Sequence, residues 1–104
     1  DCGGIKSGYS LHSNNLNPDY EFINKWLHIL LPAFNNISKD VSKAKQLEQL
    51  EEESIKNSII NLFSFPYIKK AVEDKNLSIH GLIHNIGSGG LKYLNPSSEE
   101  FENL

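Results

Sequence analysis

The sequence predicts a helix-rich chain of the mixed α/β class that ends in a strand hairpin. Apolar residues recur at helical spacing over 23–31 and again, more loosely, over 47–63. Between 77 and 86 the apolar period changes to two, and the glycine-rich run 87–90 leads to a second apolar stretch at 91–94. A period near 3.6 is typical of amphipathic helices, whereas alternation is typical of half-buried strands. We therefore expect helices over most of the chain and strands only near its end.

Composition and charge describe one ordinary domain, 1–104, of a soluble protein. The chain has 104 residues, of which 38% are hydrophobic and 22% charged, and its net charge is −3. This length is enough to bury a modest core. The acidic balance offers no basic stripe for phosphates, so no nucleic acid partner is expected. No run approaches the roughly 20 apolar residues that cross a bilayer, so we expect no membrane partner and predict a cytoplasmic location.

The only cysteine of the chain lies close to its start, before a predicted short helix at 5–11. Cys2 precedes Gly3 and Gly4, and Gly8 with the polar run after it should end the helix. A free cysteine is most often a small buried hydrophobe. The alternative is a metal ligand, but one thiol cannot close a tetrahedral zinc site without partners from elsewhere. Because the chain also contains no Met, we expect it to be a fragment.

A second helix is predicted at 18–31. Asn17 fits the N-cap and Pro18 the first helical position. The expected apolar stripe consists of Ile23, Trp26, Leu27, Leu30 and Leu31. Trp26 should anchor the core, because aromatic side chains dominate core burial. Pro32 should end or kink the helix at the preceding residue, which leaves 33–40 as a polar connection.

A longer helix is predicted at 41–64 and a short one at 66–75. The longer helix carries an acidic run, Glu48, Glu51, Glu52 and Glu53. A carboxylate metal site is one interpretation of this run. A solvated helix face is preferred, because catalytic carboxylates need burial or a charged partner to shift their pKa values. Pro66 can open the short helix, and Asn76 is its expected C-cap.

The end of the chain is expected to form a hairpin from strands at 77–86 and 91–94. The alternation places Leu77, Ile79, Gly81 and Ile83 on one face of the first strand. The run 87–90 is interpreted as the turn. A phosphate-cradling loop is the alternative, but no helix that begins with Lys and Ser or Thr follows these glycines. The polar tail 95–104 should be loosely held.

The four histidines of the chain do not predict a zinc site by themselves. His80 and His84 share a strand face, but their Cα atoms would lie about 13 Å apart at the rise of a strand. His80 is expected to be half-buried and hydrogen-bonded, and His84 to line a cleft or face solvent. His12 lies in a turn and His28 off the apolar stripe, without an evident partner. Nucleophilic catalysis therefore has no candidate base.

Four stretches, in this order, resemble the C-terminal half of a β-class carbonic anhydrase. Asp1-Cys2-Gly3-Gly4-Ile5 matches the end of that family's His-x-x-Cys-Gly-Gly segment. Trp26 and the later Leu31-Pro32-Ala33 resemble its Trp-containing helix. The stretches 53–62 and 65–68 are similar to a family pattern that runs from Glu to Asn-Leu and on to Tyr-Pro-Phe-Val. The stretch 77–91, with His80-Gly81, looks like the late strand that carries His-Gly-x-x-Tyr-Asp.

The resemblance implies a mainly parallel sheet flanked by helices, of which this chain is the C-terminal part, and a homodimer or higher homo-oligomer. It also implies a Zn²⁺ ion held by two Cys and one His, whose bound hydroxide attacks carbon dioxide to give bicarbonate. Matched residue by residue, Cys2 is the second Cys ligand. By the same matching, Gly3 directs its backbone N–H toward the substrate, where a fixed donor stabilises developing negative charge.

The resemblance also implies that this chain is an incomplete enzyme. The family's Cys-x-Asp-x-Arg segment and its zinc-binding His have no counterpart in 1–104, and His84 stands where the family often has Tyr. We therefore expect the activity to belong to an intact parent, and the 104 residues alone to be inactive and partly molten. Two alternatives stay open. One is a non-catalytic helical module that binds a partner helix through the Trp26 helix and the 55–63 stripe, and the other is a decayed gene product.

Overall fold

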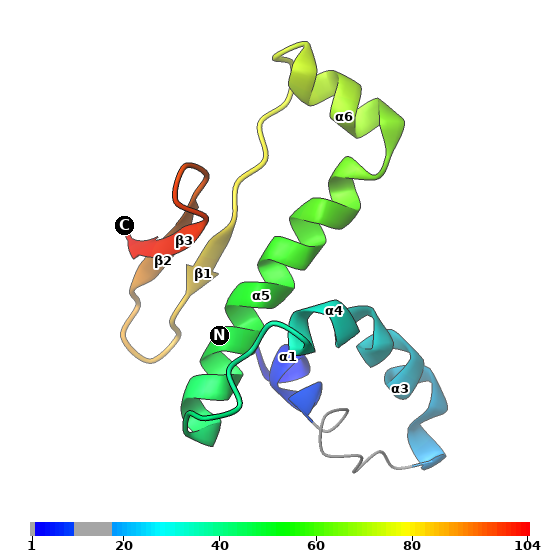
Figure 1. The fold of residues 1–104 in the computed structure, drawn as a ribbon, viewed down its shortest axis with the longest axis vertical. Helices are drawn as coiled ribbons and strands as arrows, with labels where there is room; N and C mark the ends of the chain where they lie inside the picture. The colour runs from blue at the N-terminus through cyan, green and yellow to red at the C-terminus, as the bar shows by residue number, and fades with distance from the viewer. Residues whose placement is uncertain (1, 10–17) are drawn as a thin grey trace. The chain divides into compact units, whose positions relative to one another are not determined.

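The structure, a computed structural model, describes residues 2–9 and 18–104, which belong to two units. The first unit is Cys2–Ser54 and is helical, and the second contains Ile55–Leu104. Figure 1 shows the long helix α5, which begins in the first unit and ends in the second, and the strands, which all follow it in the chain. The prediction of a helix-rich mixed chain with strands near its end is confirmed.

The helices before α5 are short and the first of them differs from its prediction. They are α1 (Gly3–Ser7), the 3-10 helix η1 (Pro18–Tyr20), α3 (Glu21–Leu27), the 3-10 helix η2 (His28–Leu30) and α4 (Leu31–Phe34). The predicted helix at 5–11 begins earlier, because both glycines are helical and Cys2 takes the N-cap position. Gly8 is the C-cap of α1, as expected. The predicted N-cap Asn17 lies outside the described residues.

The apolar stripe predicted at 23–31 is only partly buried. Leu27 is 3% exposed, whereas Trp26 is 49% exposed, so the prediction that Trp26 anchors the core is wrong. The helix is not continuous, because α3 gives way to η2 after Leu27. Residues three apart eclipse one another in a 3-10 turn. The buried face therefore follows a spacing of three, through Leu27, Leu30 and Ala33.

The core of the first unit includes part of the segment that was expected to be a polar connection. Its buried apolar residues are Leu27, Leu30, Ala33, Phe34, Ile37 and Leu50, with Ile5 packed against them. The prediction of a polar connection at 33–40 is therefore wrong where apolar side chains enter this core. Pro32 lies in the first turn of α4, where the missing N–H of proline has no helical acceptor to lose. Consequently Pro32 begins a short helix instead of ending a long one.

Helix α5, Lys43–Phe63, confirms the prediction of a long helix at 41–64. Its buried face differs from a normal apolar stripe, because three of its four buried residues, Gln46, Leu50, Glu51 and Ser54, are polar. Gln46 donates from Nε2 to the carbonyl oxygens of Ser38 and Lys39 at 3.2 and 3.3 Å. Side-chain hydrogen bonds thus accompany apolar packing on this helix. Within the described part of the chain, no helix combines the length and apolar character that a membrane span needs.

Helix α6, Pro66–Glu73, follows α5, and a residue with a left-handed backbone lies directly after its C-cap. Its C-cap is Asp74 and not Asn76, so the predicted cap is wrong by two positions. Lys75 has a φ of 60°. The next amide, that of Asn76, donates to the carbonyl oxygen of Ala71 at 2.9 Å, and Lys75 N donates to Val72 O at 3.1 Å. This pair of bonds is a Schellman motif, in which glycine is the usual left-handed residue.

The strands form one antiparallel sheet of order β1-β2-β3. They are β1 (Leu82–His84), β2 (Leu91–Asn95) and β3 (Glu100–Asn103). The predicted hairpin is confirmed, with Leu82 opposite Tyr93. The first strand is shorter than 77–86. Its predicted alternation is confirmed at Ile79, Gly81 and Ile83, which are less exposed than their neighbours, but not at Leu77, which is 40% exposed. The described residues show no parallel strand pair.

The turn of the hairpin needs glycine at one position. Asn85 N donates to Gly90 O, and Gly89 N donates to Asn85 O, both at 2.8 Å. Gly89 has a φ of 73°, which glycine adopts without a steric cost. The Asn85 side chain also accepts a hydrogen bond from Ser88 N at 2.9 Å. These contacts confirm that 87–90 serves as a turn in the hairpin.

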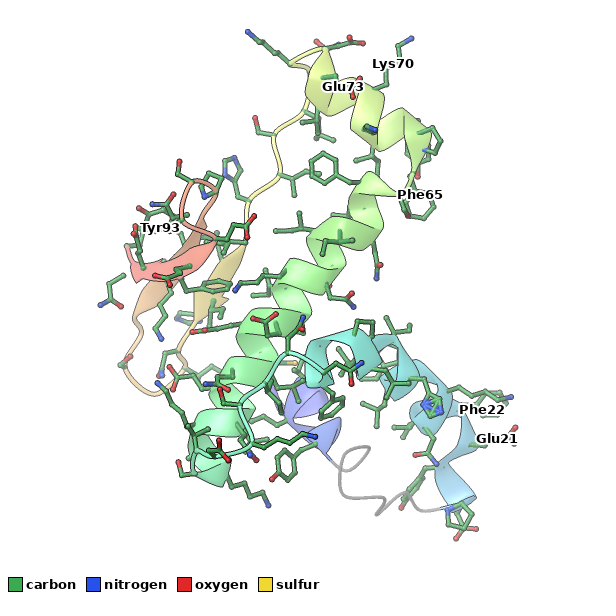
Figure 2. All side chains as sticks on the ribbon, viewed as in Figure 1. Glu21, Phe22, Phe65, Lys70, Glu73 and Tyr93 are labelled. Carbon is green, nitrogen blue, oxygen red and sulfur yellow. The ribbon has the colours of Figure 1, made fainter. Side chains whose placement is uncertain are left out.

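The segment 95–104, expected to be loosely held, contains β3. Leu94 pairs with Phe101 across the ladder. The Tyr93 hydroxyl donates to Glu102 Oε2 at 2.7 Å, and Asn95 Nδ2 donates to the same oxygen at 3.2 Å; Tyr93 is labelled in Figure 2. Cross-strand polar pairs of this kind stabilise a sheet even where one strand has little apolar character. The polar composition of the tail therefore did not prevent strand formation.

Candidate functional site

The candidate site lies at the start of α1, around Cys2. Cys2 has an extended backbone, with φ −146° and ψ 113°, and its carbonyl oxygen accepts a hydrogen bond from Lys6 N at 3.0 Å. The residue and its free thiol are exposed. The interpretation of Cys2 as a small buried hydrophobe is therefore wrong, and its thiol is accessible to a ligand or a metal ion.

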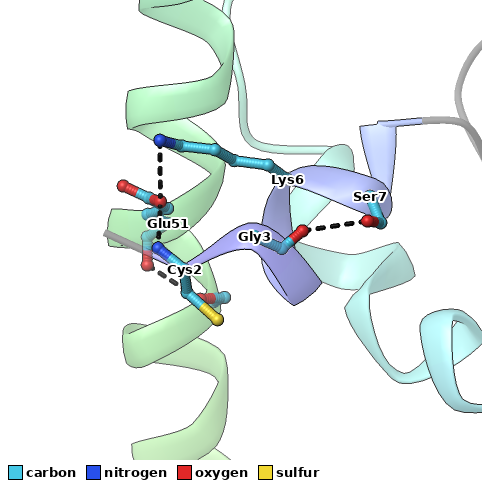
Figure 3. Close-up of polar contacts among 6 residues, drawn as sticks. Cys2, Gly3, Lys6, Ser7 and Glu51 are labelled. Atoms are coloured by element: carbon cyan, nitrogen blue, oxygen red, sulfur yellow. Dashed lines mark hydrogen bonds and ion pairs between the residues drawn. The ribbon is translucent and has the colours of Figure 1, made fainter.

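Glu51 of α5 holds the backbone of Cys2. The N–H of Cys2 donates to Glu51 Oε1 at 2.8 Å, and Lys6 Nζ lies 3.7 Å from the same oxygen. Figure 3 shows both nitrogens at the Glu51 carboxylate, with the Cys2 sulfur directed away from it. The Glu51 side chain is 11% exposed and that of Lys6 39%. The acidic run was interpreted as a solvated face, which is wrong for Glu51.

Residues 2–9 contact α5 at their second end as well, through Tyr9. The Tyr9 hydroxyl donates to Gln46 Oε1 at 2.6 Å. The ammonium of Lys43 lies 5.3 Å from the centroid of the Tyr9 ring, within the range of a cation–π contact. Cys2 contacts position 51 of α5 and Tyr9 contacts position 46. Two separated contacts therefore attach both ends of segment 2–9 to α5.

The two glycines after Cys2 have different surroundings. A Cβ atom on Gly3 would meet nothing within 4 Å. On Gly4 it would lie 3.4 Å from Trp26 Cη2 and 3.8 Å from Cys2 Sγ. Trp26, half exposed and not a core residue, therefore lies against the start of α1 on the side of the thiol. The space beside Gly3 leaves its backbone open to a small ligand.

Three of the four histidines lie among the described residues. His28, His80 and His84 are exposed, so the prediction of a half-buried His80 is wrong. His12 lies outside the described residues. Across residues 2–9 and 18–104, no three His, Cys, Asp or Glu side chains lie close enough together to hold a metal ion.

Comparison with known proteins shows a family match over most of the chain. The family model described as carbonic anhydrase matches residues 1–91. Beta carbonic anhydrase 3 of Arabidopsis thaliana is 34% identical over 91 residues, which cover 85% of this chain and 35% of the relative. This chain belongs to the β-class carbonic anhydrase family. The family expected from the Cys2-Gly3-Gly4 motif and the later stretches is thus confirmed.

Two further carbonic anhydrases are also matched over only part of their length. Carbonic anhydrase of Pseudomonas aeruginosa is 30% identical over 76% of this chain and 37% of the relative. "Beta carbonic anhydrase 6, mitochondrial" of Arabidopsis thaliana is 28% identical over 95% of this chain and 35% of the relative. The matches thus span between 35% and 37% of these relatives. No solved structure matches the chain significantly.

The described residues of this β-class carbonic anhydrase chain can supply one ligand of a zinc ion, the thiolate of Cys2. An exposed thiol on a fixed backbone has the right donor chemistry, because thiolates are preferred zinc ligands. A zinc site needs three or four protein ligands. The described residues do not complete such a set, so they alone do not form a zinc site.

Proposed function

We propose that this chain takes part in the reversible hydration of carbon dioxide to bicarbonate, with Zn²⁺ as the cofactor. The observation that carries the proposal is an exposed Cys2 thiol on an anchored backbone, within a match to carbonic anhydrases over residues 1–91. Zinc supplies a hydroxide nucleophile near neutral pH, because it lowers the pKa of its bound water to about 7. The reaction class is that of a lyase, as in the family.

In this proposal Cys2 supplies one thiolate ligand and Gly3 a backbone donor. Gly3 is the first residue of α1, so its N–H has no acceptor within that helix. The open space at its Cβ position supports the approach of a small anion. The remaining zinc ligands and the mainly parallel sheet come from outside residues 2–9 and 18–104 in the whole protein, which we also propose to be a homodimer or larger.

The first test is the zinc content and activity of the chain by itself. We expect the 104 residues alone neither to bind catalytic zinc nor to hydrate carbon dioxide. Elemental analysis and stopped-flow hydration assays on the purified chain measure both. Stoichiometric zinc together with hydration activity would contradict the expectation that the 104 residues alone are an incomplete enzyme.

The second test addresses the role of Cys2 in the whole protein. The Cys2→Ser variant should lose bound zinc, because serine replaces the thiolate. His28→Gln is the matched control, since His28 is an exposed candidate ligand of the same unit that the proposal leaves out of the site. If Cys2→Ser retains zinc, Cys2 is not a zinc ligand. If only His28→Gln loses zinc, the ligand is His28 and not Cys2.

A second candidate function is a non-catalytic module that binds a partner helix. Helix α3 favours it, because Phe22 is 85% exposed and Ile23 and Trp26 are also exposed; Figure 2 shows Phe22 projecting from this helix. The same surface supports the proposed homo-oligomer. A Phe22→Ser variant separates the two functions. An interaction module loses its partner on this change, whereas the enzyme keeps its zinc.

The third alternative, a decayed gene product, is favoured if the unmodified whole protein has neither zinc nor activity.

The cytoplasmic location and the lack of a nucleic acid partner remain predictions from the composition. The first rests on the lack of an apolar run long enough to cross a bilayer, and the second on a net charge of −3. Cell fractionation of the whole protein measures the first, and a filter-binding titration with duplex DNA the second. Recovery in an organelle fraction would overturn the cytoplasmic prediction.

A further inference from the structure

We infer that Glu51 is a positioning residue, which fixes the backbone of Cys2 and thereby the direction in which the thiol points. The hydrogen bond from Cys2 N to Glu51 Oε1 joins residues that are 49 positions apart. A bond from a backbone N–H to a carboxylate is charge-assisted and stronger than one between neutral groups. Glu51 therefore ties the Cys2 segment to α5 by a contact that local sequence does not provide.

Cys2 needs such a contact because the residues after it are flexible. Gly3 and Gly4 lack Cβ atoms, and glycine loses more conformational freedom on ordering than any other residue. Helix α1 has only five residues, too few to be stable by itself. Glu51 holds the N–H of Cys2 and Lys6 N holds its carbonyl oxygen. With both backbone groups bonded, rotation about χ1 is the main freedom left to the thiol.

The charge of Glu51 is balanced at the same oxygen. A buried carboxylate is costly unless it is paired and hydrogen-bonded. Lys6 Nζ lies 3.7 Å from Oε1, so the cation comes from α1 itself. The ion pair thus attaches α1 to α5 one turn after the Cys2 contact.

Glu51 is itself on a firmly held part of α5. Its neighbour Leu50 is completely buried, and Ser54 Oγ donates to the Glu51 carbonyl oxygen at 2.8 Å. Gln46, on the preceding part of the helix, holds Tyr9 at the other end of the segment. The carboxylate is therefore a fixed acceptor, which is the property that positioning a ligand residue requires.

The test measures hydrogen exchange of the Cys2 amide in the full chain, for Glu51→Ala, Glu51→Gln and Glu48→Gln. We expect exchange about 10-fold faster or more in Glu51→Ala, because the acceptor is gone. Glu51→Gln keeps an acceptor oxygen but loses the charge, so its acceleration should be smaller. Glu48 is on the same helix, with a side chain 43% exposed and an ion pair to Lys45, and its variant should exchange like the parent.

The exchange of the Leu50 amide in the same samples reports whether the first unit stays folded. A Cys2 amide that exchanges at the parent rate in Glu51→Ala, with Leu50 still protected, would overturn the inference. Should Glu51→Ala unfold the unit, Glu51→Gln decides. Parent-like exchange of the Cys2 amide in Glu51→Gln, with Leu50 still protected in that variant, would then overturn the inference.

The consequence for zinc rests on the proposed function. If Cys2 is a zinc ligand, loss of a residue that orients a ligand costs about 10–100-fold in metal affinity. Chelator competition on the whole protein should show this loss for Glu51→Ala and not for Glu48→Gln. If Cys2→Ser retains zinc, the proposed function fails, while the exchange of the Cys2 amide still decides the positioning role.

Discussion

Gly81 is the position at which a single methyl group should disturb the second unit most clearly. A Cβ atom there would lie 2.8 Å from Ile55 Cγ2, 3.1 Å from Leu94 Cβ and 3.4 Å from Ile59 Cδ1. The first two distances are shorter than normal carbon contacts, and neither atom is at the end of a flexible side chain. The Gly81→Ala variant must therefore move either the end of α5 or strand β2.

The cost of this change can be estimated from two opposing effects. Overpacking of a well-packed core costs about 1–3 kcal/mol. Replacing glycine by alanine restricts the unfolded chain, which stabilises the folded state by about 0.4–1 kcal/mol. We expect a net destabilisation of the second unit by about 1–2 kcal/mol, which corresponds to roughly a 5–30-fold change in the equilibrium between its folded and unfolded forms.

Hydrogen exchange of the Leu94 amide is the appropriate assay, because Leu94 N donates to Gly81 O at 2.8 Å. The amide should lose protection by this factor in Gly81→Ala. Gly87→Ala is the control, since its Cβ would meet only the side-chain oxygen of Asn85, at 3.3 Å, and should change stability by less than about 0.5 kcal/mol. Parent-like protection of Leu94 in Gly81→Ala would refute the packing argument.

Three further predictions follow from individual contacts. Leu50→Ala should destabilise the first unit by about 2–5 kcal/mol, because Leu50 is 0% exposed, and a loss below about 1 kcal/mol in urea denaturation would contradict this. Lys75→Gly should stabilise α6 by about 0.5–1 kcal/mol in the same assay, because the φ of 60° is strained for lysine; a loss of stability would count against it. The hydrogen bond from Tyr93 to Glu102, followed by the negative charge of that carboxylate, raises the pKa of Tyr93 above its usual 10.0. The stabilisation of the fold by this hydrogen bond is present below pH 10 and is lost as the pH rises through the raised pKa of Tyr93. Above pH 10 the stability of the Tyr93→Phe variant should therefore decrease less steeply than that of the parent.

Local signals in the sequence predicted several elements correctly. The long run at 41–64 and the proline at 66 predicted α5 and α6, and the glycines at 87–90 predicted the hairpin turn. These signals work because periodicity and turn chemistry depend on residues close in sequence. The predictions failed where a distant contact or a change of helix type intervened, as with Trp26, whose helix changes to a 3-10 turn two residues later, at His28.

The candidate site shows the same division. The sequence by itself determined the family, the element types and Cys2 as the residue of interest, because each depends on a short motif or a local period. Only the tertiary structure decided that Glu51 is buried against the Cys2 backbone, that Trp26 lies at the start of α1, and that β3 pairs with β2. These features depend on which side chains and strands meet across tens of residues of chain, and the spacing along a single sequence does not specify such meetings.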